Sequence, residues 1–367
     1  MKKVMHLLWD GFHGGVQRYV SKIAVSNYWQ NYQHSVVIIT DQGATLSENN
    51  CEVPVVSLGI NANTEIIKCF KALSTYVKDN AIDIIHCHCD TLIFLSQLRL
   101  FKKQKLVYTE HGDSFVRKSR QFLTRFLWRC NGRLWDKIIQ NSHFTENAFL
   151  NKFPFLNGKT AVAANPLLET VESQRRSISS ETFNIGTVGR VEFVKGNDLL
   201  VKAAPQILRA VPHAHFHIFG DGSQKDTLVS LVKTLGIKHK FTFHGFTSSP
   251  LKAMQQLDCL AVPSRKESFG LVALEAMSVG TPVVAFKNTG VSDFLVDGHN
   301  GYLAAEGDLN SFAKAVQTMY QDKDNWIQMS TNAQLTVQEN YSMEKHINNL
   351  EGIYDEMFVV EQQEEIA

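Results

Sequence analysis

The stretch from residue 259 to 286 reads CLAVPSRKESFGLVALEAMSVGTPVVAF. The two short apolar runs at its ends, 259–262 and 282–285, have the length and composition of buried strands. Between them, small and apolar residues begin at Gly270 and stop at Gly280, which predicts a tightly packed helix. A strand, a helix and a second strand in this order are typical of a parallel α/β sheet.

The same alternation of short apolar runs and longer helical patterns extends along the chain in two series. The first series contains the candidate strands 4–8, 35–40, 53–58, 82–86, 106–109, 137–140 and 160–163. The second series contains the candidate strands 183–188, 214–219, 240–244, 259–262 and 282–285. Between the two series, residues 169–182 are rich in Ser, Glu and Arg and poor in apolar side chains, which indicates a linker.

Two α/β series in 367 residues predict two domains, because a single hydrophobic core rarely grows beyond ~250–300 residues. We assign residues 1–168 and 183–340 to two Rossmann-like domains that face each other across a cleft. Ligands of such sheets bind at the carboxyl ends of the strands, so we expect the site in that cleft. Apolar residues recur at helical spacing over 341–360, and we therefore expect the segment 341–367 to pack back on the first domain.

The bulk composition argues against several classes of protein. A formal net charge of +1 does not suit a general polyanion binder, so we expect no nucleic-acid partner and a local site for any anion. The six cysteines form no framework typical of a small secreted domain, which favours a reduced, cytoplasmic protein. The first apolar run ends at Asp10, too early for a signal peptide, and no run reaches the ~18–20 apolar residues of a membrane-spanning helix.

Glycine-containing loops follow several of the candidate strands. Gly14 and Gly15 stand before a helical pattern, where free backbone N–H groups can bind phosphate. Arg190 and Lys195 follow the strand 183–188 and together supply the forked donor and the point cation that suit a diphosphate. The spacing of these glycines does not match the fingerprint G-x-G-x-x-G, which argues against a NAD-dependent oxidoreductase.

Two glutamates flank the start of the helix predicted in the opening stretch. Glu267 lies in the loop before the helix, and Glu275 lies about a turn and a half into it, since a turn takes ~3.6 residues. Carboxylates accept hydrogen bonds from sugar hydroxyls, while the N–H groups and the dipole of a helix N-terminus attract phosphate. The segment therefore predicts a site for a ligand that carries both hydroxyl groups and phosphates.

Taken together, these segments resemble the retaining glycosyltransferases of family 4. The resemblance is carried by 267–284 with its paired glutamates, by 189–196, by 219–222 and by 13–15, and it runs from residue 1 to about residue 358. It implies the GT-B fold, with an acceptor-binding N-terminal domain and a donor-binding C-terminal domain. It also implies transfer of a sugar with retention of anomeric configuration, and a UDP-sugar is our first choice of donor.

The resemblance also implies roles for single residues. Arg190 and Lys195 would bind the donor diphosphate. Glu267 would hold hydroxyls of the donor sugar, and Glu275 would hold those of the ribose. His111 matches the active-site histidine of many members, and it joins Arg190, Lys195 and Glu267 as a catalytic candidate. The set of residues implied to bind the donor is Gly14, Gly15, Arg190, Lys195, Gly220, Glu267, Phe269, Gly270, Leu271 and Glu275.

One segment and one mechanistic question stay open. The segment 289–293 reads TGVSD and departs from the glutamate-containing motif of the family, so contacts with the donor sugar at this place are undecided. Retention can arise from a double displacement or from a same-face reaction that the leaving phosphate assists, and the family is usually described by the second. No residue of the chain is assigned as a covalent nucleophile.

No cofactor and no metal ion are predicted, because Arg190 and Lys195 can neutralise the diphosphate. The sequence His86-Cys87-His88-Cys89 has the residue types of a metal site. However, side chains alternate between the two faces of a strand, so the histidines and the cysteines should point apart. We expect His86 or His88 to line the cleft instead.

The segment 115–137 combines basic and apolar side chains. On a helix, four basic residues fall on one side, namely Lys118, Arg125, Arg129 and Arg133. Phe126 falls in the adjoining sector. Two interpretations stay open: contact with an anionic membrane surface, or a helix that packs on its own sheet with a solvated basic edge. The first interpretation implies a lipid-linked acceptor, as in bacterial surface-polysaccharide assembly, and a peripheral position on the inner face of the plasma membrane.

Two other functions are compatible with the same fold. A GT-B nucleotide-sugar epimerase would use the same donor, and a non-catalytic protein would bind nucleotide sugar without ever releasing nucleoside diphosphate. The presence of Arg190, Lys195 and both glutamates favours a transferase, which acts on a saccharide or lipid-linked acceptor.

Overall fold

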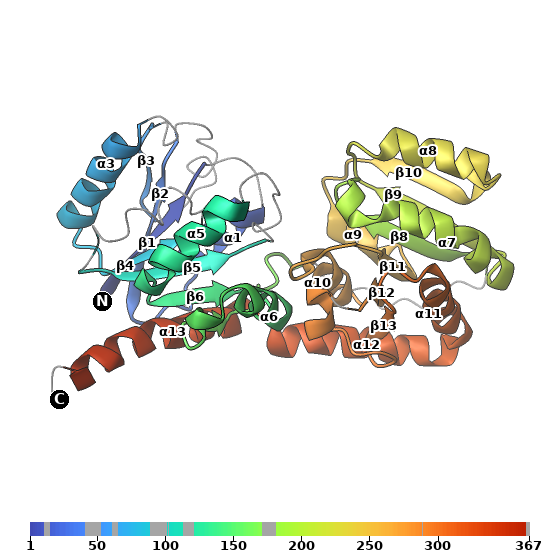
Figure 1. Ribbon diagram of the computed structural model, residues 1–367. Helices are drawn as coiled ribbons and strands as arrows, with labels where there is room; N and C mark the ends of the chain where they lie inside the picture. Colours follow the sequence, from blue (N-terminus) through green and yellow to red (C-terminus); the bar gives the residue numbers. More distant parts are fainter. Residues whose placement is uncertain are drawn as a thin grey trace. The chain divides into compact units, whose positions relative to one another are not determined.

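The chain folds into two compact units in the computed structural model (Figure 1). Unit 1 comprises Met1–Leu168 and Met343–Ala367, and unit 2 comprises Glu169–Ser342. The structure describes residues 1–10, 15–40, 53–60, 65–88, 101, 103–112, 121–170, 181–287 and 289–364. Each unit is a parallel sheet with helices, so the two Rossmann-like halves expected from the sequence are confirmed.

Unit 1 contains a seven-stranded sheet with the order β3-β2-β1-β4-β5-β6-β7, in which all pairings are parallel. Its strands are β1 (Lys2–Leu8), β2 (Tyr32–Ile38), β3 (Val55–Ser57), β4 (Ile84–Cys87), β5 (Lys105–Glu110), β6 (Lys137–Gln140) and β7 (Thr160–Val162). Its described helices are α1 (Gly15–Ala24), α3 (Ile66–Asp79), α5 (Gln121–Asn131), α6 (His143–Lys152) and α13 (Met343–Glu364).

The sheet of unit 1 buries a separate apolar core on each face, because its strands carry apolar residues on both sides. On one face, Leu7 and Cys87 pack in the same core as Trp128 of α5. On the other face, Val4 and Leu8 pack with α1 and α13. The buried residues that α13 contributes are Ile347, Leu350, Ile353, Tyr354 and Met357. The last helix therefore packs on the N-terminal domain, as the sequence predicts.

Unit 2 contains a six-stranded parallel sheet with the order β10-β9-β8-β11-β12-β13. Its strands are β8 (Phe183–Val188), β9 (Ala214–Phe219), β10 (Phe241–Gly245), β11 (Cys259–Val262), β12 (Val283–Phe286) and β13 (Gly301–Ala304). Its helices are α7 (Asn197–Ala210), α8 (Lys225–Thr234), α9 (Pro250–Gln255), α10 (Leu271–Ser278), α11 (Leu309–Gln321) and α12 (Lys323–Asn340). Helices α7, α8 and α11 bury their apolar residues in one continuous core with the sheet.

The order of the strands reverses once in each sheet. In unit 1 the reversal lies between β1 and β4, and in unit 2 it lies between β8 and β11. At such a point the connections on the two sides leave in opposite directions and open a crevice at the carboxyl ends of the strands, where ligands of α/β proteins bind. The fold therefore predicts binding sites at the residues that follow β1 and β4 in unit 1, and at those that follow β8 and β11 in unit 2. None of the described helices is both long enough and apolar enough to cross a membrane.

Candidate active site

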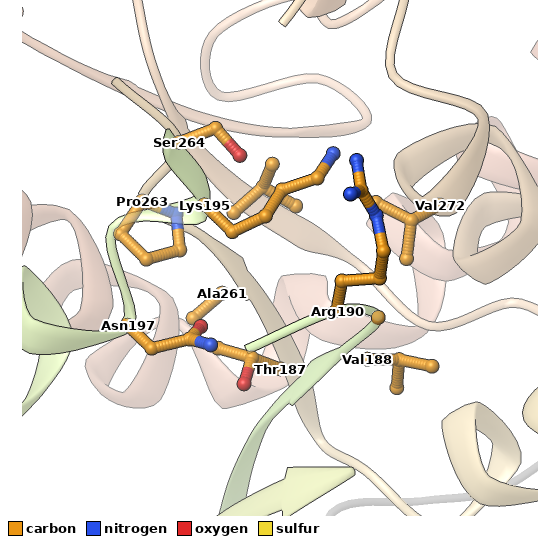
Figure 2. A pocket seen from close by; sticks show the side chains of 11 residues that line it. Thr187, Val188, Arg190, Lys195, Asn197, Ala261, Pro263, Ser264 and Val272 are labelled. Atoms are coloured by element: carbon orange, nitrogen blue, oxygen red, sulfur yellow. The ribbon is translucent and has the colours of Figure 1, made fainter. Parts of the chain in front are cut away.

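A pocket in unit 2 opens at the carboxyl ends of β8 and β11, where the strand order reverses (Figure 2). Its empty volume is about 280 Å³, part of which is open to solvent. The pocket is lined by Thr187, Val188, Gly189, Arg190, Lys195, Asn197, Ala261, Val262, Pro263, Ser264 and Val272. Figure 2 shows the side chains of Arg190 and Lys195 extending toward the same part of the opening. Two of the predicted phosphate-binding residues therefore share one pocket.

Lys195 ends a short 3₁₀ turn, Phe193–Lys195, that connects β8 to α7. Its ammonium group lies 2.7 Å from a carboxylate oxygen of Glu267, and both side chains are mostly buried. Ser264 Oγ lies 3.3 Å from the same oxygen of Glu267. The structure thus brings two of the predicted catalytic residues into direct contact although 72 positions separate them in the sequence. Arg190 is exposed and makes no ion pair within the described part of the chain.

The segment that carries Lys195 is held by Arg265. The guanidinium donates to both carboxylate oxygens of Asp198 at 2.7 and 2.8 Å, and to the carbonyl oxygen of Phe193 at 2.7 Å. It also lies 3.9 Å from the centre of the Phe193 ring, a cation–π contact. Burial alone would raise the pKa of Asp198, but the hydrogen bonds from Arg265 and Lys202 outweigh it and hold this pKa at about 2.

The loop with Glu267 continues into α10, which begins at Leu271. Gly270 has φ +98°, a left-handed conformation, and a Cβ atom at this position would collide with Val291. The N–H of Gly290 donates to the carbonyl oxygen of Glu267 at 2.8 Å, and Phe269 is buried against Phe294. Glycine is therefore required where the chain turns into α10. Within the described residues, no backbone acceptor binds the N–H groups of 269–271, as expected at the start of a helix.

Three other residues that the resemblance implies for donor binding do not line this pocket. Glu275 is partly buried in the second turn of α10. Gly220 has φ +135° and approaches the backbone of Gly189 so closely that no Cβ atom would fit. Gly15 is exposed at the first position of α1, and Gly14 lies outside the described residues. The roles of these residues in donor binding stay predictions.

Sequence reasoning missed three polar residues of the pocket. Thr187 is buried, and its Oγ1 has no hydrogen-bond partner among the described residues. Ser264 is also buried and contacts Glu267, and Asn197 is the buried first residue of α7. Each of them lies at a strand end or a helix start, which is the signal that could have identified them.

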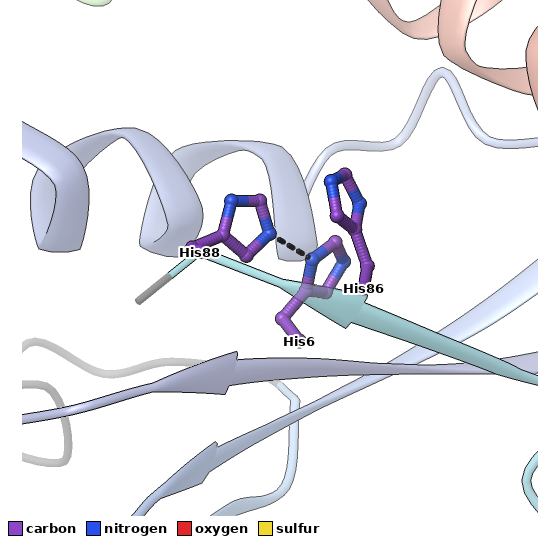
Figure 3. Close-up of side chains that lie close together, drawn as sticks. All are labelled: His6, His86 and His88. Atoms are coloured by element: carbon purple, nitrogen blue, oxygen red, sulfur yellow. Dashed lines mark hydrogen bonds between the residues drawn. The ribbon is translucent and has the colours of Figure 1, made fainter. Parts of the chain in front are cut away.

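In unit 1, His111 directly follows β5 and is partly buried. Its Nε2 lies 2.9 Å from Nδ1 of His88, and burial, together with His346, lowers the pKa of His111 to about 3. His88 Nε2 lies in turn 3.0 Å from Nδ1 of His6, a hydrogen bond drawn in Figure 3. His86 and His88 are both buried within unit 1, and His86 bonds Thr109 and Tyr354, so the expectation that one of them lines an open cleft is wrong.

His6, His86 and His88 are the one candidate metal site found among the described residues, with ligand atoms within 4.8 Å of one another. Figure 3 shows the three rings gathered at β1 and β4. All six of their ring nitrogens already have a hydrogen-bond partner, which a bound metal would have to displace. Cys87 points to the opposite face and packs in an apolar core, as alternation along the strand predicts. Metal independence of the enzyme stays a prediction.

Comparison with known protein families agrees with the division of the chain into two domains. The family model described as Glycosyltransferase Family 4 matches residues 13–167, and the model described as Glycosyl transferases group 1 matches residues 170–336. The fold and the two family matches together show the class of protein. The chain is a glycosyltransferase with the GT-B fold. Within that class it belongs to the glycosyltransferases of family 4.

Individual relatives resemble the chain over most of its length. A glycosyltransferase of Haemophilus influenzae, described as uncharacterized, is 25% identical over 364 residues, which cover 96% of this chain and 100% of the relative. Poly(ribitol-phosphate) alpha-N-acetylglucosaminyltransferase of Staphylococcus aureus is 23% identical over 317 residues, covering 79% of this chain and 62% of the relative. Among solved structures, Anabaena Alr3699/HepE in complex with UDP has a TM-score of 0.79 at 21% identity, with 97% of this chain and 100% of that chain covered.

Proposed function

We propose that this glycosyltransferase transfers a sugar from a UDP-sugar, with retention of anomeric configuration, to a saccharide or lipid-linked acceptor in the assembly of a bacterial surface polymer. The proposal depends chiefly on one observation, the pocket at the strand reversal of unit 2 that contains Arg190 and Lys195 beside Glu267. A forked cation, a point cation and a carboxylate in one place suit a diphosphate that is joined to a sugar.

The reaction builds negative charge on the departing phosphate while the bond to the sugar breaks. Arg190 and Lys195 stabilise this charge, and a well-placed donor of this kind contributes ~3 kcal/mol in comparable sites. Glu267 keeps the ammonium of Lys195 in place at 2.7 Å, and its carboxylate can also accept from a sugar hydroxyl. Retention then follows from a same-face attack that the leaving phosphate assists, with no covalent intermediate on the protein.

The nucleotide is tested by thermal shift with UDP, GDP and ADP, each with its glucose derivative. A ligand at 100 times its Kd stabilises the folded protein by ~2.7 kcal/mol, which raises the melting temperature measurably. The HepE structure holds UDP, and we expect UDP to give the largest shift here. A larger shift with GDP or ADP would replace the proposed base and keep the rest of the proposal.

The reaction is tested by following UDP release and the anomeric proton of the product by NMR. An α-linked product from an α-linked donor supports retention, and a β-linked product would refute it. Incubation of the donor without acceptor is the matched control, because formation of an epimer would identify the alternative enzyme. Binding without any UDP release would identify the non-catalytic alternative. Full turnover in EDTA is expected, since Arg190 and Lys195 supply the positive charge.

Lys195→Ala and Glu267→Ala test the assignment of the site. We expect Lys195→Ala to lower the rate of transfer by at least about 100-fold, in the range for loss of one donor to a developing oxyanion. Glu267→Ala should act in the same direction, because the carboxylate of Glu267 accepts from Lys195 and holds its ammonium group in place. Lys225→Ala is the control, because Lys225 forms a comparable 2.7 Å ion pair with Asp221 on the surface of unit 2. Wild-type rates in all three variants would remove Lys195 and Glu267 from the site.

The acceptor side of the proposal depends on α5. Residues 115–120 lie outside the described residues, but the described part of α5 exposes Arg125, Phe126 and Arg129. Trp128 of the same helix is buried against unit 1, so the helix packs on its own domain and also presents basic and apolar side chains to solvent. These two features together support a peripheral position on the inner, anionic face of the plasma membrane.

Sedimentation with liposomes tests this contact. The protein should pellet with anionic vesicles at low salt and remain in solution with zwitterionic vesicles or at high salt, because exposed charges are screened. Charge reversal at both sites, Arg125→Glu with Arg129→Glu, should abolish pelleting. Two exposed cations on unit 2 offer a control for charge alone, since Arg209→Glu with Lys233→Glu should have no effect. Absence of pelleting by the wild-type protein would refute the membrane contact.

A further inference from the structure

Four histidines of unit 1 form a continuous chain of hydrogen bonds between their rings. His34 Nδ1 lies 2.9 Å from His6 Nε2, His6 Nδ1 lies 3.0 Å from His88 Nε2, and His88 Nδ1 lies 2.9 Å from His111 Nε2. The four residues come from β2, β1, the end of β4 and the end of β5, which are successive neighbours in the sheet. The chain thus crosses the strand reversal of unit 1 and ends at the predicted active-site histidine.

The rings of this chain are neutral near pH 7. Burial is the main cause that lowers the pKa of each of them, to about 3 for His34 and His111 and well below the ordinary value for His6 and His88. Neighbouring histidines act in the same direction, because a second positive charge nearby would be repelled. Each neutral ring carries one N–H donor and one acceptor nitrogen.

A chain of neutral rings can be protonated in only two ways. Either every ring carries its proton on Nδ1 and donates toward His111, or every ring carries it on Nε2 and donates toward His34. A ring in the opposite state would place two N–H groups, or two lone pairs, against each other across a distance of about 3 Å. The tautomer of His111 is therefore coupled to the tautomers of the other three rings.

His34, at the buried end of this chain of hydrogen bonds, distinguishes the two protonation states. His34 Nε2 is buried and has no hydrogen-bond partner among the described residues. If this nitrogen carried a proton, a buried N–H would be left without an acceptor, a situation that folded proteins rarely tolerate. With the proton on Nδ1, every N–H inside the chain has an acceptor. The remaining N–H, on Nδ1 of His111, has no partner among the described residues and is available to a ligand.

We infer that His34, His6 and His88 are positioning residues that hold His111 as the Nδ1–H tautomer, so that His111 offers a ligand a hydrogen-bond donor and not a base. This inference deepens the proposed function, because it depends on His111 lying at the reacting groups. In that place the N–H donates to an oxygen of the donor or acceptor sugar. Proton removal from the attacking hydroxyl then falls to the leaving phosphate, which agrees with a same-face reaction.

The tautomer is read directly by NMR on the full-length protein labelled with nitrogen-15 histidine, without any substrate. Two-bond correlations at pH 7.5 report which ring nitrogen carries the proton, and the spectrum of His111→Gln assigns the signals of His111. We expect a neutral ring with the proton on Nδ1. A neutral ring with the proton on Nε2, or a charged ring, would overturn the inference.

Variants of His88 test the coupling. In His88→Leu the donor to His111 is lost, and the Nδ1–H state should give way to a mixture. In His88→Asn the shorter amide can still donate to His111 Nε2 from near the position of the lost Nδ1, and the Nδ1–H state should return. His86→Gln is the matched control and should leave the Nδ1–H state of His111 unchanged. His86 is also buried and its ring centre lies 4.0 Å from that of His88, but it bonds Tyr354 and Thr109, which are not part of the chain of hydrogen bonds.

Kinetics separate this inference from the proposed function. We expect His88→Leu to lower the rate of sugar transfer by about tenfold, and His88→Asn to restore most of it. Wild-type rates in His88→Leu, or no difference between the two variants, would overturn the inference. A wild-type protein that transfers no sugar at all would instead refute the proposed function, and the NMR result would then decide the inference alone.

Discussion

Arg265 fixes the position of Lys195 without contacting it. Its guanidinium joins Asp198, at the start of α7, to the carbonyl oxygen of Phe193, two residues before Lys195. The backbone N–H of Arg265 also donates to the carbonyl oxygen of Val194 at 2.9 Å. These bonds connect the loop after β11 to the turn after β8, and both segments line the pocket. The ion pair between Lys195 and Glu267 connects the same two segments.

Arg265→Lys should loosen this arrangement, because an ammonium group cannot replace a bidentate guanidinium. We expect a loss of about 1–2 kcal/mol in the free energy of unfolding of unit 2, measured in urea, and about tenfold weaker UDP binding by calorimetry. Lys202→Ala removes the other cation bonded to Asp198, but Lys202 is exposed, and its loss should change both quantities little. Equal effects of the two substitutions would contradict a positioning role for Arg265.

At the scale of elements, the connection from β8 to α7 depends on one glycine. Gly196 adopts φ +67° and ψ +20°, and a Cβ atom there would collide with the backbone carbonyl oxygen of Pro263. A flexible side chain could move aside, but the backbone at the end of β11 cannot do so without disturbing the pocket. The close approach of these two loops therefore requires the absence of a side chain at this position.

Gly196→Ala and Gly236→Ala form a matched pair of substitutions. Gly236 has nearly the same φ, +70°, but its missing Cβ atom would meet nothing within 4 Å. Gly236→Ala should cost only the strain of a left-handed alanine, about 1 kcal/mol. Gly196→Ala should cost about 3 kcal/mol or more and weaken UDP binding, because the collision adds to the strain. Similar unfolding free energies of the two variants would show that the loops can separate freely.

The sequence predicts the bounds of single strands well, but it does not predict which strands lie side by side in a sheet. Strands β8, β9 and β11 have the predicted bounds, because each is a short apolar run between polar turns. Strand β13 was missed, since Gly301–Ala304 has only a weak apolar pattern and follows the turn-forming residues His299 and Asn300. Alternation along β4 placed His86 and His88 on one face, but which strands flank β4 depends on the order of the sheet. The hydrogen bonds that connect His88 to His34 through His6, and directly to His111, could therefore not be predicted from the sequence.

Buried histidines also make unit 1 sensitive to acid. Their pKa values are lowered in the folded state, to about 3 for His34 and about 4 for His346, while unfolded histidines titrate near ~6.5. The unfolded state thus binds more protons between these values, so stability is complete above pH ~6.5 and falls as the pH drops toward 3. For each such histidine the loss is at most ~1.4 kcal/mol per pH unit.

Unfolding in urea at pH 7.5 and pH 5.0 tests this dependence. The wild-type protein should be less stable at pH 5.0. His6→Gln should lower stability at pH 7.5 but show a smaller further loss at pH 5.0, because one buried titrating ring has been removed. His143→Gln is the control, since 73% of the His143 side chain is exposed, and its loss at pH 5.0 should match that of the wild-type protein. An undiminished loss in His6→Gln would contradict the assignment.

At the scale of the whole molecule, the chain passes from unit 1 to unit 2 and returns. Unit 2 ends with Ser342, and α13 begins at Met343 and supplies buried residues to unit 1. The hydroxyl group of Tyr354 bonds His86 at 2.6 Å, and His346 bonds the hydroxyl group of Tyr19 at 2.7 Å. The N-terminal domain is therefore incomplete without α13.

Truncation after Ser342 should separate the stabilities of the two units. Five buried apolar side chains of α13 leave the core of unit 1, and each contributes roughly 1.5–3 kcal/mol, which together approach the ~5–15 kcal/mol that stabilise a typical domain. We expect unit 1 to unfold and unit 2 to remain folded and to keep its UDP-induced thermal shift. Truncation after Glu364 removes only the last three residues and should change neither unit. Cooperative unfolding of the whole chain in the longer truncation would show that unit 2 cannot fold without unit 1.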